Sequence, residues 1–185
     1  MSGIVKVLED EKIYLRPLEL QDADILYQKI NSDTEMRRLT GTQRTFTKVE
    51  IEQSFQHFAQ DKSRVGFGII RKEDDQLVGD VALNEMHDTS NRDANFRIAI
   101  FDSYVGQGYG TPAIKLMLDY GFGILNLHRI ELDVHSINDR AIHVYEKIGF
   151  KREGIKRENV YYNHKYHNSV VMSILQHEYQ ELYQK

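Results

Sequence analysis

Apolar and polar residues alternate along several stretches of the chain, as expected for strands with one buried face. The clearest stretch is Arg129–His135, in which Ile130, Leu132 and Val134 are apolar and their neighbours are polar. A polar turn at 72–75 predicts a hairpin between the strands on either side of it. In all, strands are predicted at residues 13–18, 65–71, 77–83, 94–101, 129–135, 151–162 and 165–174, with the last two joined at Asn163-His164.

Apolar residues at helical spacing lie between these strands. Thr47 and Glu50 form a capping-box pattern, so a helix is predicted to begin at Thr47 and to run to about Asp61. Three more helices are predicted: one that begins at Asp22 or Asp24, one over about 110–120, and one over 139–148 capped by Asn138 or Asp139. A polar tail is predicted after residue 174. Helices interleaved with an antiparallel meander predict an α+β fold.

Length and composition narrow the class of protein. With 185 residues, 41% of them hydrophobic, the chain is long enough for one domain with a real core. It has no Cys, which excludes disulfides, thiolate nucleophiles and Cys-ligated zinc. A net charge of −4 argues against a nucleic-acid partner, and no apolar run is long enough to span a membrane. We therefore expect a cytoplasmic protein with neither a nucleic-acid nor a membrane partner.

Three glycines stand at alternate positions in Val105–Thr111, between a predicted strand and a predicted helix. Backbone N–H groups at the start of a helix point outward and are unpaired, and Gly106, Gly108 and Gly110 allow a phosphate to approach them closely. The segment therefore predicts a phosphate or pyrophosphate site; the alternative is a mobile glycine-rich turn. Known nucleotide-binding motifs fit poorly, because no Lys follows the last glycine and the spacing differs from the dinucleotide fingerprint.

Two segments in this order resemble the GNAT superfamily of N-acetyltransferases. Residues 104–111, YVGQGYGT, are similar to its acyl-CoA pyrophosphate loop, and residues 136–150, ending in YEKIGF, are similar to its second signature. The beginning, LRPL at 15–18, and the end, 159–175, resemble the branch of ribosomal-protein and spermidine/spermine acetyltransferases. The resemblance implies a single GNAT domain over about residues 10–180, with a mixed, mostly antiparallel, twisted sheet flanked by helices.

The resemblance also implies the chemistry. Members transfer an acetyl group from acetyl-CoA directly to an amine, and Tyr145 matches the residue that protonates the departing thiolate; otherwise its helical spacing indicates a core residue. Asn138 matches a contact to the pantetheine arm, with a helix cap as the alternative. The implied cofactor-binding residues are Ile98, Ala99, Ile100, Val105, Gly106, Gln107, Gly108, Tyr109, Gly110, Thr111 and Asn138.

The resemblance favours a small polyamine as the amine substrate. A protein N-terminal amine, an aminoglycoside amine and a non-catalytic acyl-CoA sensor are the alternatives. Glu85, His87 and Asn95 are the implied substrate-binding residues, although Asn95 stands where polyamine enzymes carry a glutamate and residues 41–45 lack the carboxylates found there.

The general base is not identified by the sequence. The polar stripe Glu131, Asp133 and His135 is either part of the cofactor cleft or a solvated strand face. His164 and His167 straddle a turn, and no carboxylate completes a ligand set with them, so no metal site is predicted. Self-association into a homo-oligomer is left open, because no interface patch is recognisable.

Overall fold

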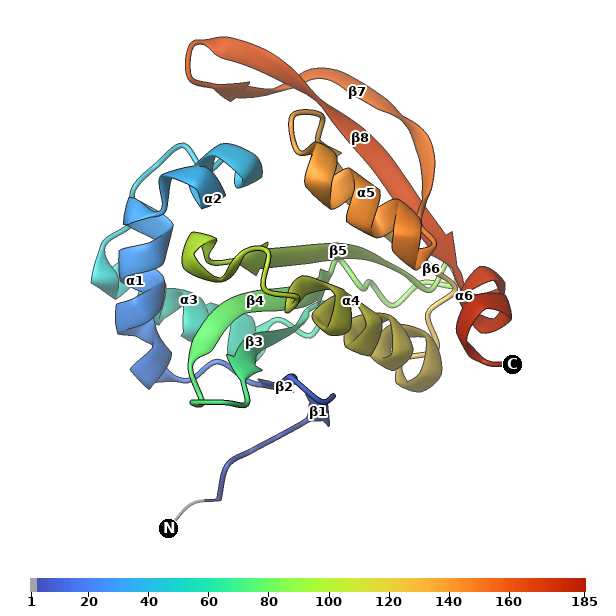
Figure 1. Cartoon of the computed structure of the whole chain (residues 1–185), viewed down its shortest axis with the longest axis horizontal. Helices are drawn as coiled ribbons and strands as arrows, with labels where there is room; N and C mark the ends of the chain where they lie inside the picture. Colours follow the sequence, from blue (N-terminus) through green and yellow to red (C-terminus); the bar gives the residue numbers. More distant parts are fainter. Residues whose placement is uncertain (1–2) are drawn as a thin grey trace.

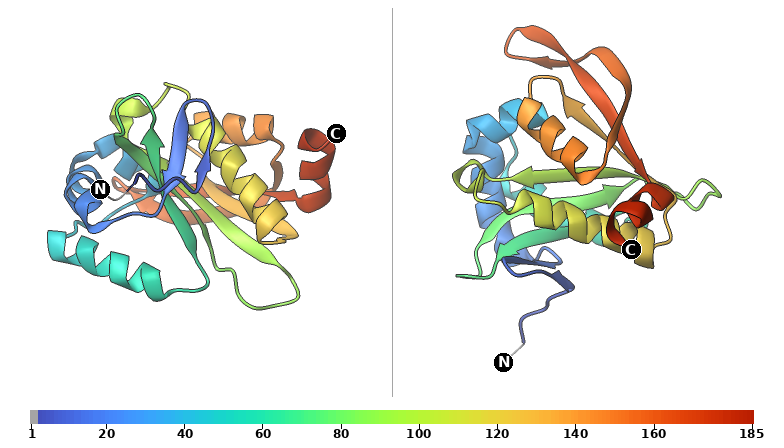
Figure 2. Two further views of the ribbon diagram at one scale, coloured as in Figure 1. Left: turned by 90° about the horizontal axis from the view of Figure 1, so that it is seen from below. Right: turned by 45° about the vertical axis from the view of Figure 1, so that its right-hand side comes forward.

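An eight-stranded twisted sheet runs through the molecule, with helices packed against both of its faces (Figures 1 and 2). The computed structural model describes residues 3–185. The strand order is β1-β2-β3-β4-β5-β6-β8-β7, and β5 with β6 is the one parallel pair among the described strands. This confirms the α+β class and the mixed, mostly antiparallel sheet. The strands are β1 (Leu8–Glu9), β2 (Ile13–Arg16), β3 (Val65–Arg71), β4 (Leu77–Asn84), β5 (Asp93–Ile100), β6 (Arg129–His135), β7 (Lys151–Tyr162) and β8 (Lys165–Leu175).

Six α-helices lie between or after the strands. They are α1 (Ala23–Ser32), α2 (Thr34–Thr40), α3 (Lys48–Gln60), α4 (Gly110–Asp119), α5 (Asp139–Ile148) and α6 (Gln176–Tyr183). The capping box at Thr47 and Glu50 is present and starts α3 as predicted. Short 3₁₀ segments occupy Leu20–Asp22 and Asp102–Tyr104, and a π-helical turn, Tyr120–Ile124, extends α4.

Two helices were not predicted. The seven-residue α2 is capped by the Asp33 side chain, which accepts a hydrogen bond from the Met36 N–H. The predicted polar tail is instead the helix α6, which buries Tyr179 against the sheet and bonds its hydroxyl to Asp119 at 3.0 Å. Both helices are too short to show a clear apolar stripe in the sequence, so tertiary contacts decide them.

Asp22 lies at the start of α1, but it does not cap the helix. Its buried carboxylate accepts two hydrogen bonds from the Arg16 guanidinium, at 2.8 and 2.9 Å, and a third from the Glu19 N–H. Residues of the LRPL segment thus anchor the chain where it passes from β2 into α1. The strand itself ends at Arg16, because Pro17 has no N–H to pair.

The sheet has a separate apolar core on each face. One core lies under α4, α5 and α6 and includes Phe96, Met117 and Ile130. The other lies under α1, α2 and α3 and includes Leu26 and Ile51. Each helix thus covers one face of the sheet.

Strands β5 and β6 pair only at their first residues. The parallel register runs from Asp93↔Arg129 to Asn95↔Glu131, and no further pair follows. Beyond Asn95 the two strands diverge and leave a gap in the middle of the sheet (Figure 1). Backbone groups of β5 that face this gap have no strand partner among residues 3–185.

The β7–β8 hairpin turns at Asn163-His164, as predicted. Both residues have positive φ, 50° and 65°, which is the left-handed conformation of a two-residue hairpin turn. A histidine adopts this conformation at some cost, and the turn keeps the hairpin fold without a glycine.

Candidate active site

A cavity of about 690 Å³ occupies the gap between β5 and β6. Its walls come from the two strands, the glycine loop, the N-terminal ends of α4 and α5, and the C-terminal part of α2. Of the residues predicted to bind cofactor or substrate, those that line the cavity are Glu85, Asn95, Ile98, Ala99, Ile100, Val105, Gly106, Gly108, Tyr109, Gly110, Thr111, Asn138 and Tyr145. The structure thus brings together most of the predicted site, from segments more than fifty positions apart in the chain.

The glycine loop is shaped for a close ligand. Gly106 and Gly108 have positive φ, 83° and 85°, and Gly110 begins α4. A Cβ atom at Gly106 would lie 3.1 Å from an Arg140 guanidinium nitrogen, and one at Gly108 would lie 3.3 Å from the Lys12 ammonium. Two cations therefore flank the backbone N–H groups at a helix N-terminus, which is an environment suited to a phosphate group.

The sequence did not single out Arg140 and Lys12. Arg140 lies inside the second signature, at the first turn of α5, but its spacing from the glycines gave no reason to join them. Lys12 comes from the β1–β2 turn, almost a hundred residues before the loop. Only the topology of the sheet brings that turn to the loop.

Two predicted residues do not line the cavity. Gln107 turns back to the loop that precedes it, where its side-chain NH₂ donates to the Ser103 carbonyl at 2.8 Å. His87 is exposed in the loop after β4, outside the cavity wall. The predicted side-chain role of His87 at the substrate is therefore not supported by its position.

The divergent part of β5 supplies backbone groups to the cavity. Ile98, Ala99 and Ile100 lie in its wall, past the last residue that pairs with β6. Their N–H and C=O groups on that side are positioned to pair with an extended ligand as a neighbouring strand would. The amide-containing pantetheine arm of an acyl-CoA offers complementary donors and acceptors.

Tyr145 serves the core and the cavity at once. The residue is 8% exposed, and its ring packs edge-to-face on Phe96 and Phe150, with centroid distances of 6.4 and 5.5 Å. Burial raises the pKa of its phenol, so the hydroxyl keeps its proton through the neutral range. The two interpretations left open by the sequence are compatible, because the ring is packed while the residue lines the cavity.

Asn138 caps a helix, as one of its two predicted roles requires, and its contact to the pantetheine arm stays a prediction. Its side-chain oxygen accepts a hydrogen bond from the Ala141 N–H at 3.1 Å and so caps α5. This bond uses the oxygen and not the NH₂ group, and the residue lines the cavity. The cap therefore fixes the orientation of the side chain, and the amide NH₂ group can donate to a ligand carbonyl.

The polar stripe on β6 divides into two parts. Asp133 and His135 line the cavity, whereas Glu131 lies outside its wall and pairs with Arg129 at 2.7 Å. The Asp133 carboxylate holds the Lys156 ammonium at 2.5 Å. The outer part of the stripe is thus a solvated strand face, and the inner part belongs to the site.

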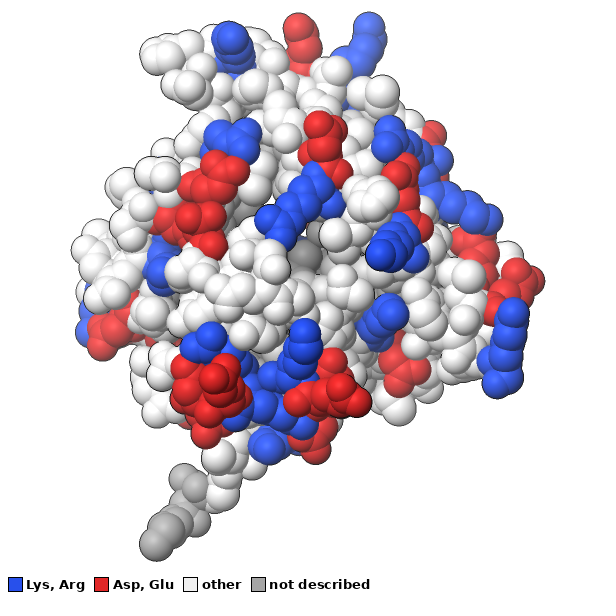
Figure 3. All heavy atoms as spheres, viewed as in Figure 1, with Lys and Arg blue, Asp and Glu red and all other residues white. Residues whose placement is uncertain are grey.

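Glu85 and Arg97 add two charged side chains to the cavity wall. Glu85 has φ of 58°, a conformation that is uncommon for a non-glycine residue and that recurs at functional sites. Arg97, which the sequence did not indicate, also lines the cavity and pairs with Asp80 at 2.6 Å. Figure 3 shows cations and carboxylates interspersed over one face of the molecule, without a field of a single sign.

In the described part of the chain, residues 3–185, no group of three or more His, Asp or Glu side chains is arranged to hold a metal ion. The same residues include no helix that is both long and apolar enough to cross a membrane.

Comparison with known proteins agrees with this geometry. Residues 12–151 match the family model described as an acetyltransferase (GNAT) domain. The chain belongs to this family. As a GNAT protein it is an N-acetyltransferase, and its cosubstrate is acetyl-CoA. The glycine loop, the open edge of β5 and the NH₂ of Asn138 fit the pyrophosphate and the pantetheine arm of that molecule.

Polyamine enzymes are prominent among the relatives of this GNAT chain. It is 36% identical over 168 residues to the spermidine N(1)-acetyltransferase of Escherichia coli, covering 90% of this chain and 88% of that protein. It is 35% identical over 130 residues to the corresponding enzyme of Vibrio cholerae, covering 70% and 74%. A crystal structure of spermidine N-acetyltransferase from Vibrio cholerae in complex with CoA and spermine matches with a TM-score of 0.84 and 31% identity, covering 90% of this chain and 97% of that chain.

Proposed function

We propose that this GNAT enzyme transfers the acetyl group of acetyl-CoA to a primary amine of a polyamine of the spermidine or spermine type. The observation that carries the proposal is the likeness to spermidine acetyltransferases over nine-tenths of the chain. The cavity supports it, because the exposed carboxylate of Glu85 lies in its wall and can attract an ammonium group.

In a direct transfer, the residues around the cavity hold acetyl-CoA in place and donate a proton to its leaving group. When bound, acetyl-CoA supplies a thioester carbonyl for attack by the amine, and the C–N bond forms as the C–S bond breaks. Ile98 and Ile100 fix the acyl arm through their backbone groups, and the loop at Gly106 and Gly108 anchors its phosphates. Tyr145, which packs on Phe96 and Phe150 in an apolar part of the cavity wall, would give a proton to the departing sulfur.

The burial of Tyr145 affects both partners in that proton transfer. An ordinary phenol ionises near pH 10 and a thiol near pH 8.5, so the hydroxyl is the weaker acid. Desolvation disfavours the thiolate as well as the phenolate. The apolar wall therefore raises both pKa values and favours a neutral thiol product.

A second candidate substrate is a protein N-terminal amine. The segment between α2 and α3 has no carboxylate at residues 41–45, and its Arg44 pairs with Glu50. A cation there is unfavourable for a polycation and acceptable for a peptide. Cytoplasmic location, the 10–180 domain boundaries, the absence of a nucleic-acid partner and self-association stay predictions.

The test is an amine panel with a thiol-release readout. Purified protein and acetyl-CoA are combined with spermidine, spermine, a ribosomal N-terminal peptide or an aminoglycoside, and the products are analysed by mass spectrometry. We expect thiol release and an added acetyl group with spermidine or spermine. Acetylation of the peptide alone would identify a protein amine, and not a polyamine, as the substrate. Acetyl-CoA binding without any transfer would favour a sensor.

A further inference from the structure

His135 occupies a prominent place in the cavity wall that the mechanism above does not use. It is the last residue of β6, on the part of the strand that has separated from β5. Its side chain is half-buried and lines the cavity, as does Asp133 two residues before it on the same face. An imidazole in this position is within the wall of the proposed active site.

The end of α2 holds this imidazole in place. The helix terminates at Gly41, whose φ is 67°, and a Cβ atom there would lie only 2.6 Å from Cε1 of His135. The glycine thus allows the backbone at the end of α2 to approach the ring closely, and this contact limits the movement of the ring.

The chemistry of a neutral imidazole suits a general base. One of its ring nitrogens carries a proton, and the other is an unprotonated acceptor. The acceptor nitrogen of His135 can therefore take a proton from an ammonium group in the cavity.

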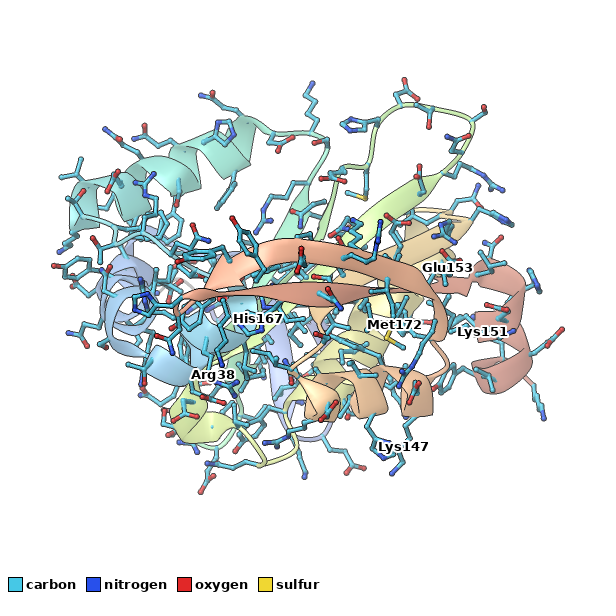
Figure 4. The ribbon with its side chains drawn as sticks, turned by 90° about the horizontal axis from the view of Figure 1, so that it is seen from above. Arg38, Lys147, Lys151, Glu153, His167 and Met172 are labelled. Atoms are coloured by element: carbon cyan, nitrogen blue, oxygen red, sulfur yellow. The ribbon has the colours of Figure 1, made fainter. Side chains whose placement is uncertain are left out.

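The charges around His135 come from four elements. Its pKa lies below the ordinary value, because burial outweighs the Arg38 carbonyl and because His167 on β8 adds repulsion. Asp133 on β6 is neutralised by Lys156 on β7, and the Arg38 guanidinium on α2 pairs with Glu35 at 2.5 Å. Figure 4 shows Arg38 and His167 at the same end of the molecule, beside the β7–β8 hairpin. His135 is therefore neutral at pH 7.

We propose that His135 is the general base that removes a proton from the acceptor ammonium before it attacks the thioester. The assignment rests on the proposed amine acetylation. The ammonium loses one proton to the free imidazole nitrogen, and His135 later releases it to solvent. The second proton, lost by nitrogen after the C–N bond has formed, restores the Tyr145 hydroxyl, so that one proton is released per turnover.

Other cavity groups are less suited to this step. A carboxylate is a weaker base than an imidazole towards an ammonium, and the carboxylate of Asp133 is also engaged by Lys156. The buried Tyr145 keeps its proton and serves as the acid. Glu85 thus attracts the cation, while His135 accepts the proton.

The test compares pH profiles of the wild type and His135→Gln with the most active amine of the panel. We expect kcat at pH 7 to fall about 10²-fold or more in the variant, the low end of general-base effects. The rate of the wild type should change little with pH above pH 6.5. The rate of the variant should rise about tenfold per pH unit, because only amine that is already deprotonated, or that hydroxide deprotonates, can then react. Added imidazole should partly restore His135→Ala.

Three controls separate catalysis from folding. Acetyl-CoA affinity and the thermal midpoint of His135→Gln should match the wild type. His57→Gln changes an exposed histidine on α3, outside the cavity, and should leave the profile unchanged. Gly41→Ala displaces the ring without removing it, so kcat should fall while imidazole gives no rescue.

The outcomes distinguish this inference from the proposed function. An active wild type with His135→Gln within twofold of it, and with the same pH profile, would overturn the base assignment alone. A wild type that acetylates no amine would overturn the proposed function and the base assignment with it.

Discussion

Tyr145 shows how one residue combines packing and chemistry. Replacement by Phe keeps the ring between Phe96 and Phe150 and removes only the hydroxyl. We expect kcat to fall by about 10²–10⁴-fold, the usual range for loss of a general acid. Acetyl-CoA affinity, measured by calorimetry, should stay within about twofold, since the phosphate and pantetheine contacts are untouched. Unchanged turnover would remove Tyr145 from the mechanism.

Gly108 carries a second prediction at this scale. Gly108→Asp puts a side chain on a backbone with φ of 85° and adds a negative charge where a phosphate should lie, beside Lys12. We expect acetyl-CoA to bind at least tenfold more weakly, or about 1.4 kcal/mol. Gly123→Asp is the matched control, because a Cβ atom there meets no atom within 4 Å. Equal losses in the two variants would argue against a phosphate at the loop.

At the scale of elements, the buried ion pair before α1 should matter more than its exposed neighbour. Asp22→Ala leaves the Arg16 guanidinium, 12% exposed, without its partner. We expect a loss of about 3–5 kcal/mol in the free energy of unfolding. Asp24→Ala breaks the exposed pair with Lys48 and should cost about 1 kcal/mol or less. Chemical denaturation measures both, and similar midpoints would contradict the anchoring role of Asp22.

Glu153 links β7 to β6 and β8 through hydrogen bonds whose contribution to stability depends on pH. Glu153 on β7 accepts from Arg129 and Ser173, and these hydrogen bonds lower its pKa from 4.5 to about 2 (Figure 4). Because the folded-state pKa is the lower one, the stabilisation is complete above about pH 4.5 and is lost as the pH falls towards 2.

Glu153→Gln tests this dependence. We expect a loss of about 1 kcal/mol at pH 7, reduced for solvent screening because the side chain is 40% exposed. The difference from the wild type should shrink between pH 4.5 and 2. Glu11→Gln, at an exposed turn, serves as the reference variant. A difference that is constant across this window would exclude the ion pair as its source.

Most elements could be predicted from local patterns, because alternation, capping and glycines act within a few residues. The start of α3 follows from Thr47 and Glu50, and the hairpin follows from its two long strands. The site was predictable in part, through two contiguous motifs. Lys12, Arg97 and the ring of His135 under Gly41 depend on strand order and divergence, which no local spacing encodes.

At the scale of the whole molecule, the gap between β5 and β6 also bears on the order of kinetic events. An acyl-CoA lying along β5 would form one wall of the space that receives the amine. Binding of the amine first would leave that wall absent, so an ordered sequence with acetyl-CoA leading follows from the split sheet. CoA should then inhibit competitively against acetyl-CoA and noncompetitively against the amine. The separation of β5 from β6 thus predicts the order in which the two substrates bind.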